Sequence, residues 1–174
     1  IGDFLPSPFA FDHVIAEVEV DGEKFFLDPT RINQRGPLGQ IYIPNFGLGL
    51  RVAAGTTGLM PVGPRKESFG RNSVVERLRV SAPESASHSS LEVATVATGL
   101  AAERLRTRFS SSGSHAIREE YLDFYADKYP QIESAGPITT QDDPETNTFR
   151  MNEFYRVPEF WKEHKDGGRI GRIS

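Results

Sequence analysis

The alternation of apolar and polar residues predicts a β-hairpin close to the start of the chain. Apolar side chains occupy every second position over residues 14–20, and the pattern resumes after Asp21-Gly22. An Asp-Gly pair between two such runs is a strong signal for a two-residue turn, because both positions tolerate a positive φ. This turn places Val18 opposite Phe25 and gives the hairpin one apolar face.

The pattern further along predicts a second unit that mixes strands and helices. Four segments alternate as strands do, and two have the apolar spacings of three and four that are typical of amphipathic helices. The order β-β-α-α-β-β results, over residues 72–80, 90–98, 100–110, 114–129, 131–141 and 146–157. The helix side that we expect to pack on the sheet carries Leu105, Phe109, Ile117, Tyr121 and Phe124.

A region rich in Gly and Pro separates the hairpin from this second unit. The sequence pattern changes after the break Val62-Gly63-Pro64-Arg65-Lys66, and this change predicts a domain boundary. We therefore expect an α+β fold with three parts. They are a first unit over residues 1–66, an α+β domain over residues 67–163 and a tail over residues 164–174.

The composition narrows the classes of function. The 174 residues hold 20 Lys and Arg against 24 Asp and Glu, and a net charge of −4 does not favour a nucleic-acid binder. No apolar run approaches the length of a membrane span, and no signal peptide is visible. The absence of Cys excludes disulfides and any thiol nucleophile within these residues. Because the chain opens at Ile1, we expect it to be a piece of a longer protein.

His13 and Asp28 are the residues whose placement suggests chemistry. The hairpin register puts Ile15 opposite Asp28, so His13 and Asp28 become diagonal neighbours on one face. A carboxylate that holds one imidazole nitrogen fixes the tautomer and leaves the other nitrogen free to accept a proton from a nucleophile. Such a pair is also common as a purely structural contact, so the spacing alone leaves both interpretations open.

The segments that contain these two residues resemble a known family. Phe11-Asp12-His13-Val14-Ile15, then Asp21-Gly22, then Phe26-Leu27-Asp28-Pro29-Thr30 are similar to the His and Asp segments of bacterial transglutaminase-like proteins. These proteins share a papain-like Cys-His-Asp arrangement. The resemblance implies that His13 is the catalytic base and acid and that Asp28 is its orienting partner.

A weaker resemblance to the same family extends to segments on both sides of the hairpin. Leu5-Pro6-Ser7-Pro8 and Gln34-Arg35-Gly36 resemble a subgroup with an uncharacterised β-rich domain ahead of the core and another domain behind it. Residues 103–105 and 155–161 resemble the domain behind the core. The fold implied is the C-terminal hairpin portion of a transglutaminase-like core followed by a small α+β domain.

The missing cysteine is the serious departure from the family. The resemblance implies an acyltransferase or amide hydrolase that acts on a protein or peptide amide such as glutamine. This chemistry needs no cofactor. The nucleophilic Cys would be supplied by a missing N-terminal part of the polypeptide. This chain alone would be inactive. A periplasmic or cell-envelope location is implied by the resemblance only. The alternative is a non-catalytic interaction module of the bacterial envelope.

Other side chains that could take part in catalysis or binding have simpler, structural interpretations. No Gly-x-Ser-x-Gly elbow surrounds the serines near Gly113, which are better explained by a helix end and the next N-cap. No histidine pair has metal-ligand spacing, so we expect no metal site. Arg104, Arg106, Arg108 and Arg118 are expected on a solvated helix face, with binding of an anionic partner such as a phosphate or an acidic envelope polymer as the alternative. The acidic run at residues 142–145 is expected to be an exposed turn.

Overall fold

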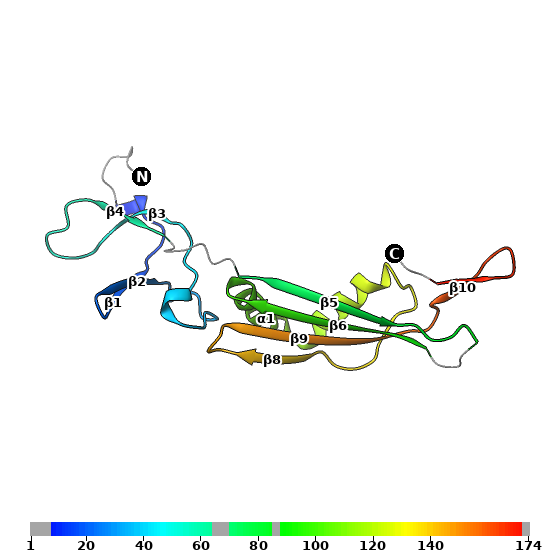
Figure 1. The fold of residues 1–174 in the computed structure, drawn as a ribbon. Coiled ribbons are helices and arrows are strands. Elements are labelled where there is room, and N and C mark those ends of the chain that lie inside the picture. The colour runs from blue at the N-terminus through cyan, green and yellow to red at the C-terminus, as the bar shows by residue number, and fades with distance from the viewer. Residues whose placement is uncertain (1–7, 64–69, 85–87, 172–174) are drawn as a thin grey trace.

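The computed structural model describes residues 8–63, 70–84 and 88–171, and within them the fold is α+β (Figure 1). The expected boundary between residues 66 and 67 lies outside the described residues. The first part contains η1 (Pro8–Ala10), β1 (Ala16–Val20), β2 (Glu23–Leu27), η2 (Leu38–Gln40), β3 (Gly47–Leu50) and β4 (Leu59–Val62). The second contains β5 (Asn72–Arg79), β6 (Ser89–Thr98), α1 (Leu100–Ala126), β7 (Glu133–Ser134), β8 (Thr139–Asp143), β9 (Thr148–Val157), β10 (Trp161–Glu163) and β11 (Arg169–Gly171).

The hairpin β1–β2 has the predicted turn and the predicted register. Val18 lies opposite Phe25 and Val20 opposite Glu23. Asp21 and Gly22 both have positive φ, 51° and 77°, as a two-residue turn that follows the strand twist requires. The turn chemistry therefore fixes which side chains share a face.

The first part of the chain has little core of its own. Its two hairpins, β1–β2 and β3–β4, are separate two-stranded sheets. Within residues 8–63 only Ile43 and Val62 are buried hydrophobic residues, while Val14 and Val52 are 81% and 97% exposed. Isolated two-stranded hairpins are marginally stable in water, so this part depends on contacts with the rest of the chain.

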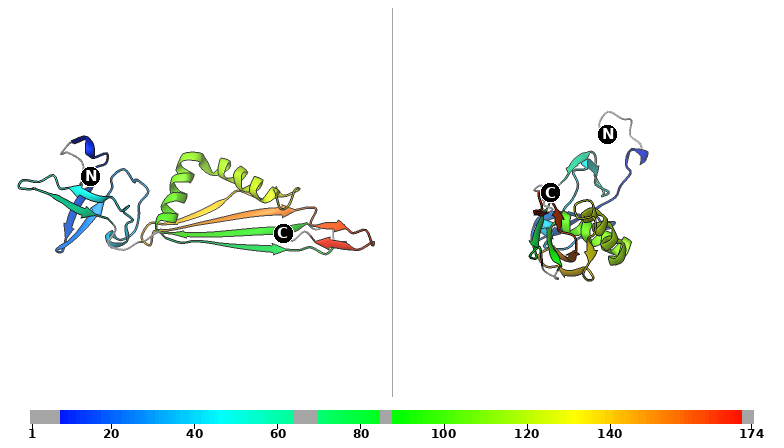
Figure 2. Two further views of the ribbon diagram at one scale, coloured as in Figure 1. Left: turned by 90° about the horizontal axis from the view of Figure 1, so that it is seen from above. Right: turned by 90° about the vertical axis from the view of Figure 1, so that its right-hand side faces the viewer.

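A five-stranded antiparallel sheet dominates the second part. Its order is β5-β6-β9, and β7 and β8 both pair with the far edge of β9. Ten residue pairs join β6 to β9, from Ser89 opposite Val157 to Thr98 opposite Thr148. Burial alternates strictly along β6, because its odd-numbered residues pack towards α1. Figure 2 shows the helix over one face of the sheet.

Helix α1 covers one face of this sheet in two segments. Gly113 has φ 76° and ψ 159°, which are not helical, so the chain kinks where the Ser-rich break predicted the end of one helix. The first segment packs at one end of the sheet, around Ala97, Ala102 and Phe149. The second packs at the other end, in a cluster that includes Leu91, Tyr125, Tyr155 and Phe160. None of the described helices is long and apolar enough to cross a membrane.

Three details differ from expectation. Phe124 was expected in the core, but it is 55% exposed because its neighbour Tyr125 takes the inward position. The strand expected over residues 131–141 is two short strands, since Pro137 lies between them and has no N–H to donate. The expected tail, residues 164–174, contains β11, which pairs with β10 around a turn closed by hydrogen bonds between His164 and Gly168 and between Gly167 and His164.

A buried arginine joins the two parts. The solvated position expected for Arg106 is wrong: this residue is 4% exposed. Its guanidinium donates to both carboxylate oxygens of Asp142 at 2.7–3.0 Å, to Asn147 Oδ1 at 2.5 Å and to the backbone oxygen of Asn33 at 3.4 Å. Arg31 adds a second link, from its Nη2 to the buried Glu103 carboxylate at 3.0 Å.

One carboxyl group lies inside the sheet and helix core. Glu153, in the middle of β9, is 2% exposed and accepts a hydrogen bond from the Tyr155 hydroxyl at 2.5 Å. Burial raises the pKa of Glu153, and the nearby Glu76 adds to this, while the Tyr155 hydroxyl and Arg108 act in the opposite direction. The pKa is raised overall, so folding favours the neutral form.

We predict that Glu153→Gln stabilises the protein at neutral pH by about 1 kcal/mol. A carboxyl group with a raised folded pKa contributes stability below its unfolded pKa, and this contribution is lost as pH rises through the folded pKa. Urea unfolding at pH 5 and pH 8 measures how the free energy of unfolding depends on pH. The control is Glu133→Gln, which removes an exposed carboxylate from β7. Equal pH dependence in wild type and Glu153→Gln would contradict the prediction.

Candidate functional site: the His13 and Asp28 pair

The hairpin brings His13 and Asp28 together at its open end. His13 lies in the extended segment before β1, and Asp28 directly follows β2. His13 Nε2 is 3.0 Å from Asp28 Oδ2, so the contact expected from the register is present. Residues 15 positions apart thus meet because a two-residue turn folds one strand back on the other.

Asp28 is buried and firmly held. It is 7% exposed, and its Oδ1 accepts hydrogen bonds from the Thr30 backbone N–H at 3.0 Å and the Thr30 hydroxyl at 2.6 Å. This leaves Oδ2 for His13. Burial alone would raise the pKa of Asp28, but the Thr30 and His13 hydrogen bonds outweigh it, and the pKa lies below its ordinary value. The side chain is therefore an anion that can orient and stabilise an imidazolium.

His13 is only partly covered, and two contacts define its ring. Its side chain is 32% exposed. The ring stacks on Phe46, with the centroids 5.3 Å apart and the planes 16° from parallel. Among the residues that the structure describes, none makes a hydrogen bond with Nδ1. One imidazole nitrogen is thus engaged with a carboxylate and the other is open to a further group.

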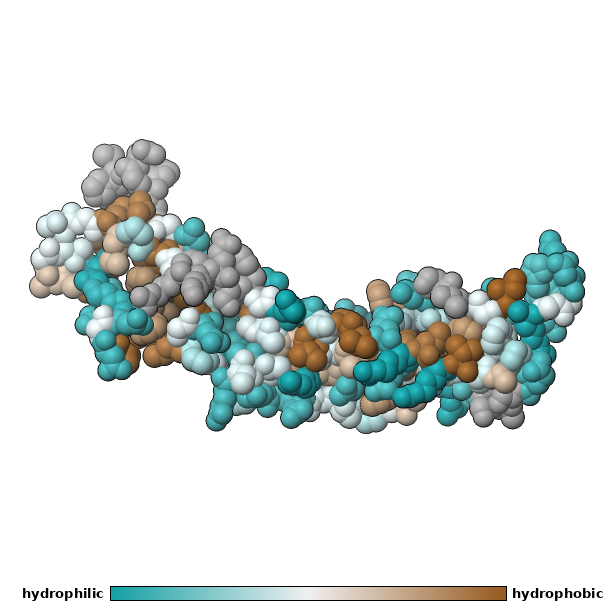
Figure 3. All heavy atoms as spheres, in the orientation of Figure 1, coloured by the Kyte–Doolittle hydropathy of each residue, from teal (hydrophilic) through white to brown (hydrophobic). Residues whose placement is uncertain are grey.

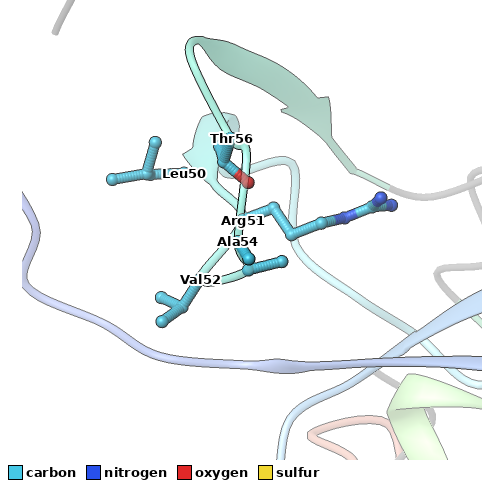
Figure 4. Close-up of a pocket in the computed structure, with 6 residues that line it drawn as sticks. Leu50, Arg51, Val52, Ala54 and Thr56 are labelled. Atoms are coloured by element: carbon cyan, nitrogen blue, oxygen red, sulfur yellow. The ribbon is translucent and has the colours of Figure 1, made fainter.

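A charged cluster and a shallow hollow lie near the two hairpins. Arg51, which follows β3, donates to the Glu17 carboxylate on β1, and Lys24 on β2 lies 3.3 Å from the same carboxylate. The hollow is lined by Leu50, Arg51, Val52, Ala53, Ala54 and Thr56. In Figure 4, the Arg51 side chain extends in the opposite direction to that of Leu50. Neither member of the His13 and Asp28 pair lines this hollow.

The remaining candidates from the sequence make local contacts. His164 Nδ1 lies 3.2 Å from Asp166 at the exposed β10–β11 turn. The Ser110 hydroxyl donates to the Arg106 carbonyl one helical turn back. Asp143 accepts from the backbone N–H groups of residues 145 and 146, which closes the acidic turn. In the described part of the chain, no three His, Asp or Glu side chains gather as metal ligands would.

Sequence reasoning missed two residues that hold the pair. Thr30 carried a usable signal, because an Asp followed two residues later by an N–H and a hydroxyl favours a local turn in which the carboxylate accepts both. Phe46 carried no such sequence signal, since it lies 33 positions from His13 and on the other hairpin. Only the packing of the two hairpins brings Phe46 to His13.

Comparison with known proteins adds no relative for this chain. No protein-family model matches it, and neither a curated protein nor a solved structure matches it.

We predict that Thr30→Val raises the pKa of Asp28 towards its ordinary value, because one of its hydrogen bonds is lost. A carboxyl group with a lowered folded pKa stabilises the fold above its unfolded pKa, and this stabilisation is lost as pH falls through the folded pKa. Thr30→Val should therefore also lower the free energy of unfolding by about 1 kcal/mol at neutral pH. Carboxyl NMR titration and urea unfolding measure the two effects. Thr56→Val, at the hollow, is the matched control, and an unchanged Asp28 titration would contradict the prediction.

Proposed function

We propose that this chain supplies the base and the orienting carboxylate of a transglutaminase-like acyltransferase or amide hydrolase. The observation that carries the proposal is the 3.0 Å contact between His13 Nε2 and the buried Asp28, with no hydrogen bond to Nδ1 from the residues that the structure describes. The resemblance of residues 11–15 and 26–30 to the His and Asp segments of that family supports it. The chain holds no Cys, so the thiol comes from outside these residues.

The chemistry assigns one role to each side chain. His13 Nδ1 accepts the proton of the thiol as sulfur attacks the amide carbonyl carbon, and the imidazolium then gives that proton to the departing amine. A thioester remains. His13 next takes a proton from water or from an amine that attacks the thioester, and the thiol is restored. Asp28 holds Nε2–H and stabilises the positive ring that forms in each half of the reaction.

The substrate class follows from the resemblance. A protein or peptide amide, with glutamine as the principal candidate, would donate the acyl group, and the same chemistry ends in hydrolysis or in cross-linking. No step needs a cofactor. An envelope location belongs to this proposal on the same basis.

An interaction module is the second candidate, favoured by the uncovered side of the five-stranded sheet. α1 covers the other side, and Figure 3 views the molecule from the side opposite α1. Val75 on β5 and Phe154 on β9 lie on the uncovered side and are 45% and 40% exposed. In this candidate, the His13 and Asp28 contact would be structural.

Substitution of His13 in the natural full-length protein tests the catalytic proposal. We expect His13→Ala to abolish labelling of the cysteine by a thiol-directed probe and turnover of a glutamine-containing peptide, because the base is gone. Asp28→Ala should cost less, since the imidazole stays. Loss of a triad member costs about four to six powers of ten in rate.

His164→Ala is the matched control for this experiment. His164 also lies beside a carboxylate, 3.2 Å from Asp166, but in an exposed turn far along the chain. It should leave labelling and turnover unchanged. Wild-type labelling and turnover in His13→Ala, or a full-length protein in which no cysteine reacts, would refute the catalytic proposal and favour the interaction module.

The 174-residue chain by itself provides a further prediction. It should show no hydrolysis of a glutamine-containing peptide and no amine incorporation, because no thiolate is present to attack. Ammonia release and incorporation of a fluorescent amine measure the two reactions. Turnover by the isolated chain, lost in His13→Ala, would mean that another group in these residues is the nucleophile.

A further inference from the structure

We infer that Phe46 is a positioning residue that fixes the plane of the His13 imidazole. The inference rests on the proposed function, because a fixed plane matters only if Nδ1 must meet a nucleophile. The observation that carries it is the nearly parallel stack of the two rings, with centroids 5.3 Å apart and planes 16° from parallel.

His13 needs such a restraint because its backbone supplies little. The residue precedes β1, so no strand ladder holds it, and about a third of its side chain is exposed. The hydrogen bond to Asp28 fixes the position of one ring atom, Nε2. The ring can still tilt about that point, and a tilt changes the direction in which Nδ1, two bonds away across Cε1, presents its lone pair.

Phe46 can supply the missing restraint because its own backbone is anchored. Asn45 Oδ1 accepts the Gly47 N–H at 3.0 Å, which closes a tight turn around Phe46. Gly47 then begins β3 and pairs with the buried Val62 on β4. The aromatic face is therefore presented by the second hairpin to a histidine on the first.

The two contacts act on different degrees of freedom. Asp28 selects which nitrogen carries the proton, and Phe46 restricts the tilt of the ring. The stack also covers one ring face, so a partner reaches His13 along the Nδ1 edge. A near-parallel aromatic pair has a preferred geometry beyond simple apolar contact, which an aliphatic side chain cannot provide.

Exchange of the His13 Nε2 proton with solvent, followed by NMR in the 174-residue chain, tests the inference. In Phe46→Leu, we expect this exchange to be about two- to tenfold faster than in wild type, because the ring tilts and breaks the Asp28 hydrogen bond more often. Phe46→Tyr keeps the aromatic face and should restore the wild-type rate. Phe154→Leu, which removes a half-exposed Phe from β9, should not change it.

Amide exchange in β1 and β2 separates positioning from general loosening of the hairpin. The inference requires these amides to keep their wild-type protection in Phe46→Leu. Equal acceleration of the amides and the ring proton would overturn it, as would a wild-type ring rate in Phe46→Leu or a Phe46→Tyr rate like that of Phe46→Leu. The measurement needs no thiol, so intact stacking together with failure of the labelling experiment would refute the catalytic proposal alone.

Discussion

A buried guanidinium must find a partner for nearly every N–H it carries, and Arg106 meets this constraint by drawing three segments onto α1. Asp142 comes from β8, Asn147 from the turn before β9, and the Asn33 carbonyl from the loop that follows β2. Because the loop at Asn33 continues directly from Asp28, the position of the candidate site relative to the sheet depends on these bonds. Arg31 and Glu103 strengthen the same junction with a second, partly buried ion pair.

Much of the candidate site could be predicted because its cause is local. The Asp21-Gly22 turn sets the hairpin register, and the register alone brings His13 within hydrogen-bond distance of Asp28. The same holds for the central strands, where burial alternates along β6 with the period of the sequence. The break at Gly113 was also visible, since a Ser-rich run ending in Gly disfavours a continuous helix.

The features that escaped prediction depend on contacts between distant segments. Arg106 looked like part of a basic helix face, yet a residue two positions from Arg104 and Arg108 points to the opposite side of a helix, where Ala102 is fully buried. The position of Arg106 on the helix therefore carried a signal for burial. Phe46 gave no signal at all, because its stack with His13 requires the placement of one hairpin against another.

The scarcity of buried apolar side chains in the first part of the chain has a consequence for its local opening. Cooperative units that bury little apolar surface open at a small fraction of the global unfolding free energy. Ile43 and Val62 are the buried hydrophobic residues among residues 8–63, whereas the sheet and α1 hold the large clusters. The His13 and Asp28 pair therefore belongs to the unit with the lower opening free energy, and its lifetime in the closed form is set by the Arg31–Glu103 ion pair and the hydrogen bond from Arg106 to the Asn33 carbonyl, which tie this unit to α1.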